Sequence, residues 1–165
     1  MAQENDRLLA RLVTARVEFV LVGGVAANLH GSSFVTRDLD VVAPLTVENC
    51  GRILEALGDL EPRFYQAHGK PRVTRTPQEL AELRNLYFDT TQGRIDLLGS
   101  LPPVGDFERV LAQSLWVEVG SSRVRLVSLD DLIAVKAYVG RPKDRAVELE
   151  LRAIRERLCA AKPEP

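Results

Sequence analysis

The segment Val20-Leu-Val-Gly-Gly-Val-Ala-Ala-Asn-Leu-His-Gly-Ser-Ser-Phe-Val-Thr-Arg-Asp-Leu-Asp40 decides the fold of this chain. An apolar run that ends in Gly23-Gly24 predicts a strand and a turn, and the small residues after it predict a short helix. Asp38 and Asp40 then open a second apolar run. Because alternate residues of a strand point to the same face, the two carboxylates stand side by side, which is tolerable mainly where a cation neutralises them. The segment therefore predicts metal-dependent chemistry on a nucleotide phosphate.

Hydrophobic periodicity outside this segment alternates between helical and strand spacing. Thr46 and Ser128 are preferred N-cap residues and predict the starts of two helices. Helices are predicted over 4–15, 25–30, 47–57, 107–112, 129–139 and 143–160, and strands over 17–22, 38–43, 83–90, 94–98, 115–119 and 123–127. The segment 58–80 is rich in proline, glycine and charge and is predicted to be a loop.

This order of elements predicts an α/β (α+β) fold, in which helices pack on a mixed β-sheet rather than on a purely parallel one. We expect a core over residues 1–127 and a C-terminal helical segment over 128–165 that packs on the core, forming a single domain overall.

Composition narrows the class of protein. The 165 residues include 22 Lys and Arg and 23 Asp and Glu, which gives a net charge of −1. This charge argues against a protein that coats nucleic acid by bulk charge, but it does not exclude binding of RNA or nucleotides through a local basic patch. Cys50 and Cys159 show no CxxC spacing and indicate free thiols in a reducing compartment, the cytoplasm. The N-terminus carries acids, and no stretch approaches about 18 apolar residues, so neither a signal peptide nor a membrane span is expected.

A third carboxylate completes the predicted metal site. Asp96 lies among apolar residues of the strand predicted over 94–98, where a carboxylate needs a metal or a hydrogen-bond network. If this strand neighbours the one that contains Asp40, then Asp38, Asp40 and Asp96 together hold Mg²⁺ or Mn²⁺, and Asp96 helps to deprotonate an attacking hydroxyl. Asp89 is the competing candidate and reads more simply as a strand-edge residue.

The phosphates of a nucleoside triphosphate need donors. Gly23 and Gly24 allow close approach of the backbone, and the helix that follows offers free N–H groups. Ser32 and Ser33 are predicted to add hydroxyl donors, and Lys136 to neutralise the triphosphate, although a surface lysine is an equally good interpretation of Lys136. We assign the large aromatics to packing: Trp116, Tyr65, Tyr87 and Tyr138.

These motifs resemble the nucleotidyltransferase superfamily that includes DNA polymerase β. Within it, the chain resembles the small bacterial proteins around the AbiEii-type toxins and the minimal nucleotidyltransferases. The resemblance rests on Gly23-Gly24-Val25-Ala26, His30-Gly31, Thr36-Arg37-Asp38-Leu39-Asp40, Asp131-Leu-Ile-Ala-Val-Lys136 and Gly140-Arg-Pro-Lys-Asp144. It implies that Asp38, Asp40 and Asp96 are metal ligands and that Lys136 and Asp144 complete the site. An acid favoured near a helix N-terminus is the alternative interpretation of Asp144.

Two positions depart from the family pattern, since Phe34 replaces an arginine and Val147 replaces an acid. We therefore hold two hypotheses. The first is an enzyme that moves a nucleoside monophosphate from an NTP to a hydroxyl of tRNA, protein or a small molecule such as an aminoglycoside, with release of pyrophosphate. The second is a catalytically degenerate module that binds a nucleotide or a cognate partner in a toxin–antitoxin type system. The loop 61–80, with Arg63, Lys70, Arg72 and Arg75, is the expected acceptor contact.

Overall fold

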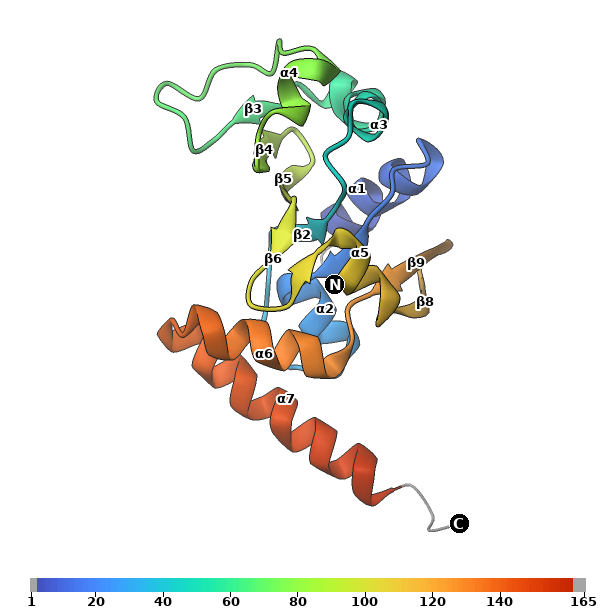
Figure 1. Cartoon of the computed structure of the whole chain (residues 1–165), viewed down its shortest axis with the longest axis vertical. Coiled ribbons are helices and arrows are strands. Elements are labelled where there is room, and N and C mark those ends of the chain that lie inside the picture. Colours follow the sequence, from blue (N-terminus) through green and yellow to red (C-terminus); the bar gives the residue numbers. More distant parts are fainter. Residues whose placement is uncertain (1–2, 162–165) are drawn as a thin grey trace.

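A computed structural model describes residues 3–161 and shows a seven-stranded sheet flanked by helices (Figure 1). In spatial order the strands are β3 (Arg63–Phe64), β4 (Asn85–Thr90), β5 (Gly93–Leu98), β2 (Leu39–Val42), β1 (Val20–Val22), β9 (Ser122–Leu126) and β8 (Leu115–Val119). A separate two-stranded sheet joins β6 (Ser100–Leu101) to β7 (Gly105–Asp106). The sheet is mixed, as predicted, because β2 runs parallel to β5 and β1 runs parallel to β9, whereas the other pairs are antiparallel.

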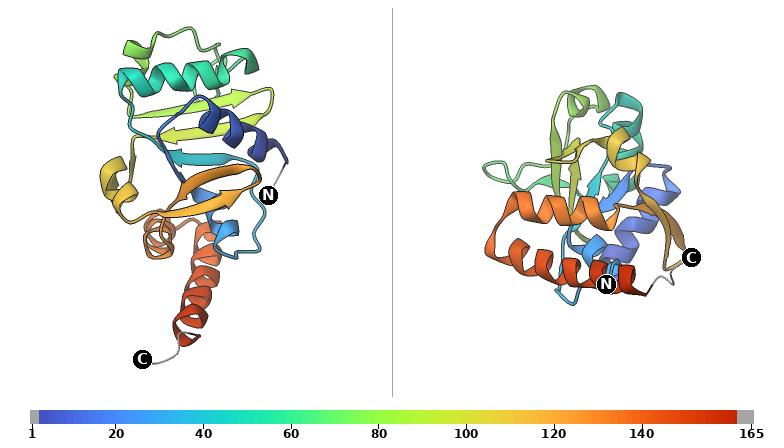
Figure 2. Two further views of the ribbon diagram at one scale, coloured as in Figure 1. Left: turned by 90° about the vertical axis from the view of Figure 1, so that its right-hand side faces the viewer. Right: turned by 60° about the horizontal axis from the view of Figure 1, so that its bottom comes forward.

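The helices form two groups around the sheet. They are α1 (Gln3–Thr14), α2 (Gly23–Leu29), α3 (Val47–Leu57), the 3₁₀ turn η1 (Gly58–Leu60), α4 (Pro77–Ala81), α5 (Phe107–Ala112), α6 (Leu129–Val139) and α7 (Pro142–Ala160). Helices α1 and α3 contact each other, while α6 contacts both α7 and α2. Helix α7 crosses α6 and extends away from the sheet toward its C-terminal end (Figure 2). No helix within residues 3–161 combines the length and the apolar character that crossing a membrane requires.

Local signals set most of the element ends. The Thr46 hydroxyl accepts a hydrogen bond from the Asn49 amide, and the Ser128 hydroxyl accepts one from the Asp131 amide, so both predicted N-caps are confirmed. Helices α3, α5 and α6 have the predicted bounds. Helix α2 begins at Gly23, two residues before the predicted start.

The loop predicted over 58–80 is wrong in part, because this segment contains η1, β3 and α4. Strand β3 exists through its pairing with β4, in which Phe64 lies opposite Phe88. Helix α4 has a local cause, since Thr76 and Glu79 form a capping box and Pro77 occupies the first turn.

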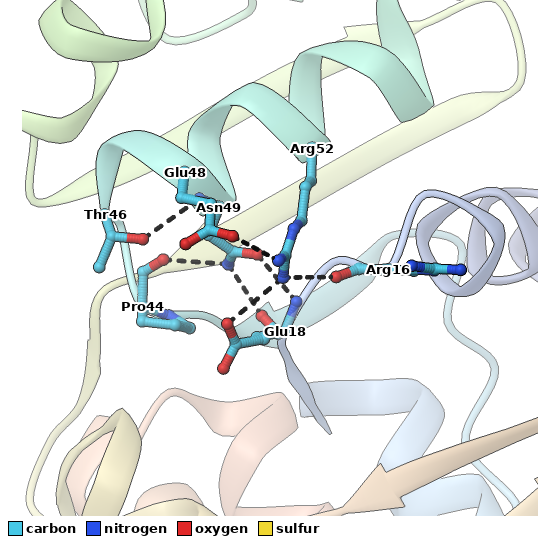
Figure 3. A network of polar contacts seen from close by, with 7 residues as sticks. All are labelled: Arg16, Glu18, Pro44, Thr46, Glu48, Asn49 and Arg52. Atoms are coloured by element: carbon cyan, nitrogen blue, oxygen red, sulfur yellow. Dashed lines mark hydrogen bonds and ion pairs between the residues drawn. The ribbon is translucent and has the colours of Figure 1, made fainter.

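A buried asparagine ties α3 to the segment that enters β1 (Figure 3). Asn49 is fully buried, and its Oδ1 accepts a 2.8 Å hydrogen bond from the Glu18 amide. Its Nδ2 donates to the carbonyls of Glu18 and Pro44, both at 3.0 Å. Arg52 adds bonds to the Arg16 carbonyl and to Glu48 at the surface. The network fixes the angle at which β1, and hence the glycine turn after it, leaves the helical layer.

Candidate active site

The sheet brings three carboxylates to one cavity. Strand β5 lies beside β2 in parallel, and Asp40 is the direct register partner of Asp96. Asp38 stands two residues before Asp40 and lines the same cavity of about 720 Å³. The adjacency of these two strands, on which the sequence interpretation depended, is thus present in the fold.

The carboxylates share an electrostatically unfavourable environment. Burial raises the pKa of Asp40 to about 6, with a further contribution from the negative charge of Asp96. Burial also raises the pKa of Asp96, and the charge of Asp38 acts in the same direction. The hydroxyl of Tyr65 opposes this effect, because it donates a 2.8 Å hydrogen bond to Asp96 Oδ1. The cavity is therefore a place where a cation gains energy from uncompensated negative charge.

The donor set suits Mg²⁺ or Mn²⁺, since hard cations prefer carboxylate oxygens. Asp38, Asp40 and Asp96 border the cavity from two adjacent strand segments. Across residues 3–161, however, the structure contains no cluster of three or more His, Cys, Asp or Glu side chains in an arrangement able to hold a metal ion. The three carboxylates thus surround the cavity without forming a closed set of three ligands.

The double glycine leaves room for the side chains of the protein itself, and not only for a ligand. Gly23 has a φ of +66°, and a Cβ at this position would collide with the Asp40 carboxylate. A Cβ on Gly24 would lie 2.5 Å from the Thr36 hydroxyl oxygen. The Gly24 amide lowers the pKa of Asp40 through a hydrogen bond. Side chains at these two positions would therefore push Asp40 and Thr36 out of place.

Lys136 and Asp144 form an ion pair at the cavity wall. Lys136 Nζ lies 2.9 Å from Asp144 Oδ1, and the two side chains are 13% and 4% exposed. Arg141 Nε contacts the other carboxylate oxygen at 2.6 Å. Because Asp144 is surrounded by these two cations, it acts here as their counter-ion. Lys136 keeps an influence on the metal-site candidates, since its charge lowers the pKa of Asp40.

Ser32 and Ser33 are engaged elsewhere. Both hydroxyls donate to the Glu150 carboxylate on α7, at 2.7 and 2.8 Å, and the Ser33 amide adds a bond of 3.0 Å. The two serines line a neighbouring hollow rather than the cavity of the aspartates. In this structure they hold α7 to the loop before β2, and a phosphate would have to displace Glu150 to reach them.

Several residues at the cavity were not singled out from the sequence. Tyr65, which we assigned to packing, bonds to Asp96, and Thr36 and Arg141 line the cavity with it. The packing assignment is also wrong for Trp116 and Tyr138, whose exposed fractions are 53% and 65%. Phe34 and Val147, the two departures from the family pattern, both line the cavity.

Comparison with known proteins supports the fold. No family model and no curated protein matches the sequence. The chain is similar to a solution structure of the antibiotic-resistance factor ANT(2'')-Ia, with a TM-score of 0.55 and 14% identity over 97% of this chain and 96% of that chain. A crystal structure of ANT(2'')-Ia in complex with adenylyl-2''-tobramycin gives a TM-score of 0.47 at 14% identity over 89% of this chain and 94% of that chain. The chain thus has a mixed α+β fold similar to that of a nucleotidyltransferase.

Proposed function

We propose that this chain is a metal-dependent nucleotidyltransferase that moves a nucleoside monophosphate from an NTP to a hydroxyl acceptor. The observation that carries the proposal is that Asp38, Asp40 and Asp96 line one cavity, in which Lys136 supplies a largely buried positive charge. Carboxylates in such positions destabilise one another, and binding of an NTP with its cation would offset this repulsion. The fold similarity to a nucleotidyltransferase agrees with this function.

The reaction needs few groups from the protein. The acceptor oxygen attacks the α-phosphorus of the NTP, the bond between the α-phosphorus and the bridging oxygen breaks, and pyrophosphate leaves with the bond electrons. In this proposal Asp96 takes the hydroxyl proton, and Tyr65 orients Asp96 through its hydrogen bond to Oδ1. Asp38, Asp40 and Asp96 are the residues that would hold Mg²⁺ or Mn²⁺, and the bound cation would supply stabilisation of charge on the phosphoryl oxygens. Lys136 lies on α6 and lines the cavity, where it would face a bound triphosphate.

The proposal also covers the domain organisation, the cellular compartment and the partner of the enzyme. The cavity takes Asp40 from the core over 1–127 and Lys136 from the segment over 128–165, which supports a single domain. The last residues of that segment, 162–165, lie outside the described part of the chain. Cys50 and Cys159 are free, in agreement with a reducing compartment such as the cytoplasm. The resemblance to AbiEii-type toxins and a toxin–antitoxin partner also belong to the proposal, and both rest on the sequence motifs alone.

A degenerate nucleotide-binding module is the second candidate function. It is favoured by Phe34 and Val147, which line the cavity with apolar side chains at positions where the family pattern has an arginine and an acid; Phe34 is exposed and Val147 is buried. Such a module would bind nucleotide or a partner protein without transferring a group.

The test is nucleotidyl transfer with labelled NTPs. Each NTP is incubated with Mg²⁺ or Mn²⁺ and with RNA, protein or an aminoglycoside as acceptor. We expect Asp38→Asn and Asp96→Asn to lower transfer by at least about 100-fold, as is common when one group that stabilises the transition state is removed. Glu118→Gln is the matched control, because Glu118 is an exposed acid on β8 away from the cavity.

Two results would decide against catalysis. One is equal transfer by wild type and Asp38→Asn; the other is no transfer to any acceptor together with NTP binding that does not depend on the metal. Calorimetric titration of NTP with and without Mg²⁺ separates the enzyme from the module, because only the enzyme requires the metal for tight binding.

A further inference from the structure

A second hollow opens beside the catalytic cavity. It has a volume of about 460 Å³ and lies between the loop after β3 and strand β4. Gln66 and Tyr87 line both the hollow and the cavity of the aspartates. A molecule seated in the hollow is therefore within reach of the reacting phosphate if the cavity binds an NTP.

The charge of this hollow differs from that of the cavity. Its charged lining residues are Arg72 and Arg75, and among its lining residues in the described part of the chain none is acidic. Arg72 is an exposed residue and holds a surface contact of 2.9 Å with Glu61 outside the lining. The other lining side chains are neutral, so the lining itself carries a net positive charge, which Glu61 partly offsets at Arg72.

Aromatic rings complete the wall. The Arg75 guanidinium lies 5.7 Å from the centre of the Phe64 ring, and Tyr87 meets Tyr65 edge-on with ring centres 6.0 Å apart. Phe64 and Tyr87 are half-buried, which leaves part of each ring open to the hollow. Planar guanidinium groups beside partly open aromatic rings provide phosphate contacts and stacking surfaces together.

We propose that this hollow binds the acceptor and that the acceptor is the end of a single-stranded nucleic acid. This inference rests on the proposed function for the transfer step. Arg72 and Arg75 suit the phosphates of such a strand, and the rings suit its unpaired bases. A polycationic acceptor such as an aminoglycoside would meet two like charges here and no carboxylate among the lining residues. A protein acceptor is the other outcome that the experiment tests.

The direct test measures binding without NTP or metal. A fluorescent single-stranded RNA oligonucleotide with a free 3′ hydroxyl is titrated by anisotropy at several salt concentrations, and a DNA of the same sequence forms a second arm. The double variant Arg72→Ala with Arg75→Ala should bind about tenfold more weakly, and its salt slope should fall by about 1.4, which corresponds to two lost phosphate contacts.

The matched control is Arg155→Ala with Arg157→Ala on α7. It removes the same charge, and one arginine of each pair makes a surface ion pair, since Arg155 contacts Asp130 at 3.1 Å. We expect its affinity to stay within twofold of wild type. Arg75→Gln, which keeps the length of a polar side chain, serves as a second variant if the double variant does not fold, and should weaken binding about threefold.

Three results would overturn the inference. The first is equal weakening by the variant and the control. The second is loss of binding only on Arg123→Ala with Arg125→Ala, because both guanidinium groups lie over the exposed ring of Trp116, at 5.0 and 4.3 Å from its centre, and offer a rival surface. The third is transfer to a protein or an aminoglycoside that Arg72→Ala with Arg75→Ala leaves unchanged. The proposed enzyme activity would then be supported and this acceptor site would be wrong.

Binding of the oligonucleotide without transfer has the opposite meaning, since the proposed function fails and the nucleic-acid site remains.

Discussion

Replacement of Asp144 by asparagine should destabilise the protein strongly, although the change removes only one charge. The Asp144 side chain is 4% exposed and its carboxylate faces two cations, Lys136 at 2.9 Å and Arg141 at 2.6 Å. Arg141 is 74% exposed and turns to solvent when the carboxylate is lost. Lys136 is only 13% exposed and cannot turn to solvent in the same way, so its ammonium group is left inside the cavity wall.

Removal of one partner of a buried ion pair costs about 3–5 kcal/mol. We expect a loss near the lower value, about 3 kcal/mol, because the negative charge of Asp40 still acts on Lys136. For a domain of this size, 1 kcal/mol shifts Tm by about 2–4 °C, so the variant should melt about 6–12 °C below wild type. Lys136→Met should also be costly, whereas Lys136→Met with Asp144→Leu should be closer to wild type than either single variant.

Urea denaturation of these four proteins at pH 7 measures the four stabilities. The pH dependence gives an independent check. Burial raises the pKa of Asp144, but the hydrogen bonds from Arg141 and Lys136 outweigh burial and hold the pKa below its ordinary value. A depressed pKa means that the stabilisation is complete above the unfolded pKa of about 3.9 and is lost as pH falls through the folded pKa. The gap between wild type and Asp144→Asn should therefore persist from about pH 7 down to about pH 5 and narrow below about pH 4. A gap under about 1 kcal/mol at pH 7, or one that does not narrow in acid, would refute this account of the pair.

Three further variants test the site and its support. Asn49→Ala removes the hydrogen bonds to the backbone of Glu18 and Pro44 and should cost about 3 kcal/mol in urea denaturation; a cost below about 1 kcal/mol would contradict it. Gly23→Ala should lower Tm, because of its φ of +66° and the Asp40 carboxylate, and adding Asp40→Gly should recover part of the loss. Asp38→Asn should cost no stability at pH 7, since the Asp38 charge raises the pKa of both other carboxylates; destabilisation by more than about 1 kcal/mol would argue against that repulsion.

The sequence predicted elements well where the cause is local. The ends of α3 and α6 follow from Thr46 and Ser128, whose hydroxyls accept a bond three residues ahead. Strand β3 has no comparable signal, because its two residues become a strand only through contact with β4. Helix α4 did carry a local signal, the capping box of Thr76 and Glu79, which the charged and proline-rich surroundings obscured.

The candidate site divides in the same way. The i, i+2 spacing of Asp38 and Asp40 is local and predicts a shared cavity, whereas the register between Asp40 and Asp96 depends on which strands become neighbours. Tyr65 reaches Asp96 across 31 positions of the chain. Ser32 meets its partner Glu150 across 118 positions, so the engagement of its hydroxyl was not predictable from nearby residues.

The double glycine and the Asp-x-Asp spacing depend on each other physically. Gly23 must lack a side chain because Asp40 lies against it. Gly24 must lack one because the Thr36 side chain lies against it. These residues would therefore be kept in an inactive protein of this fold, so their presence favours the fold more than the activity. Asp38 and Asp96 differ, since each raises the pKa of a neighbouring carboxylate and the fold gains nothing from that repulsion. Destabilising charges of this kind are typical of functional sites, and it is these two residues that favour the enzyme over the degenerate module.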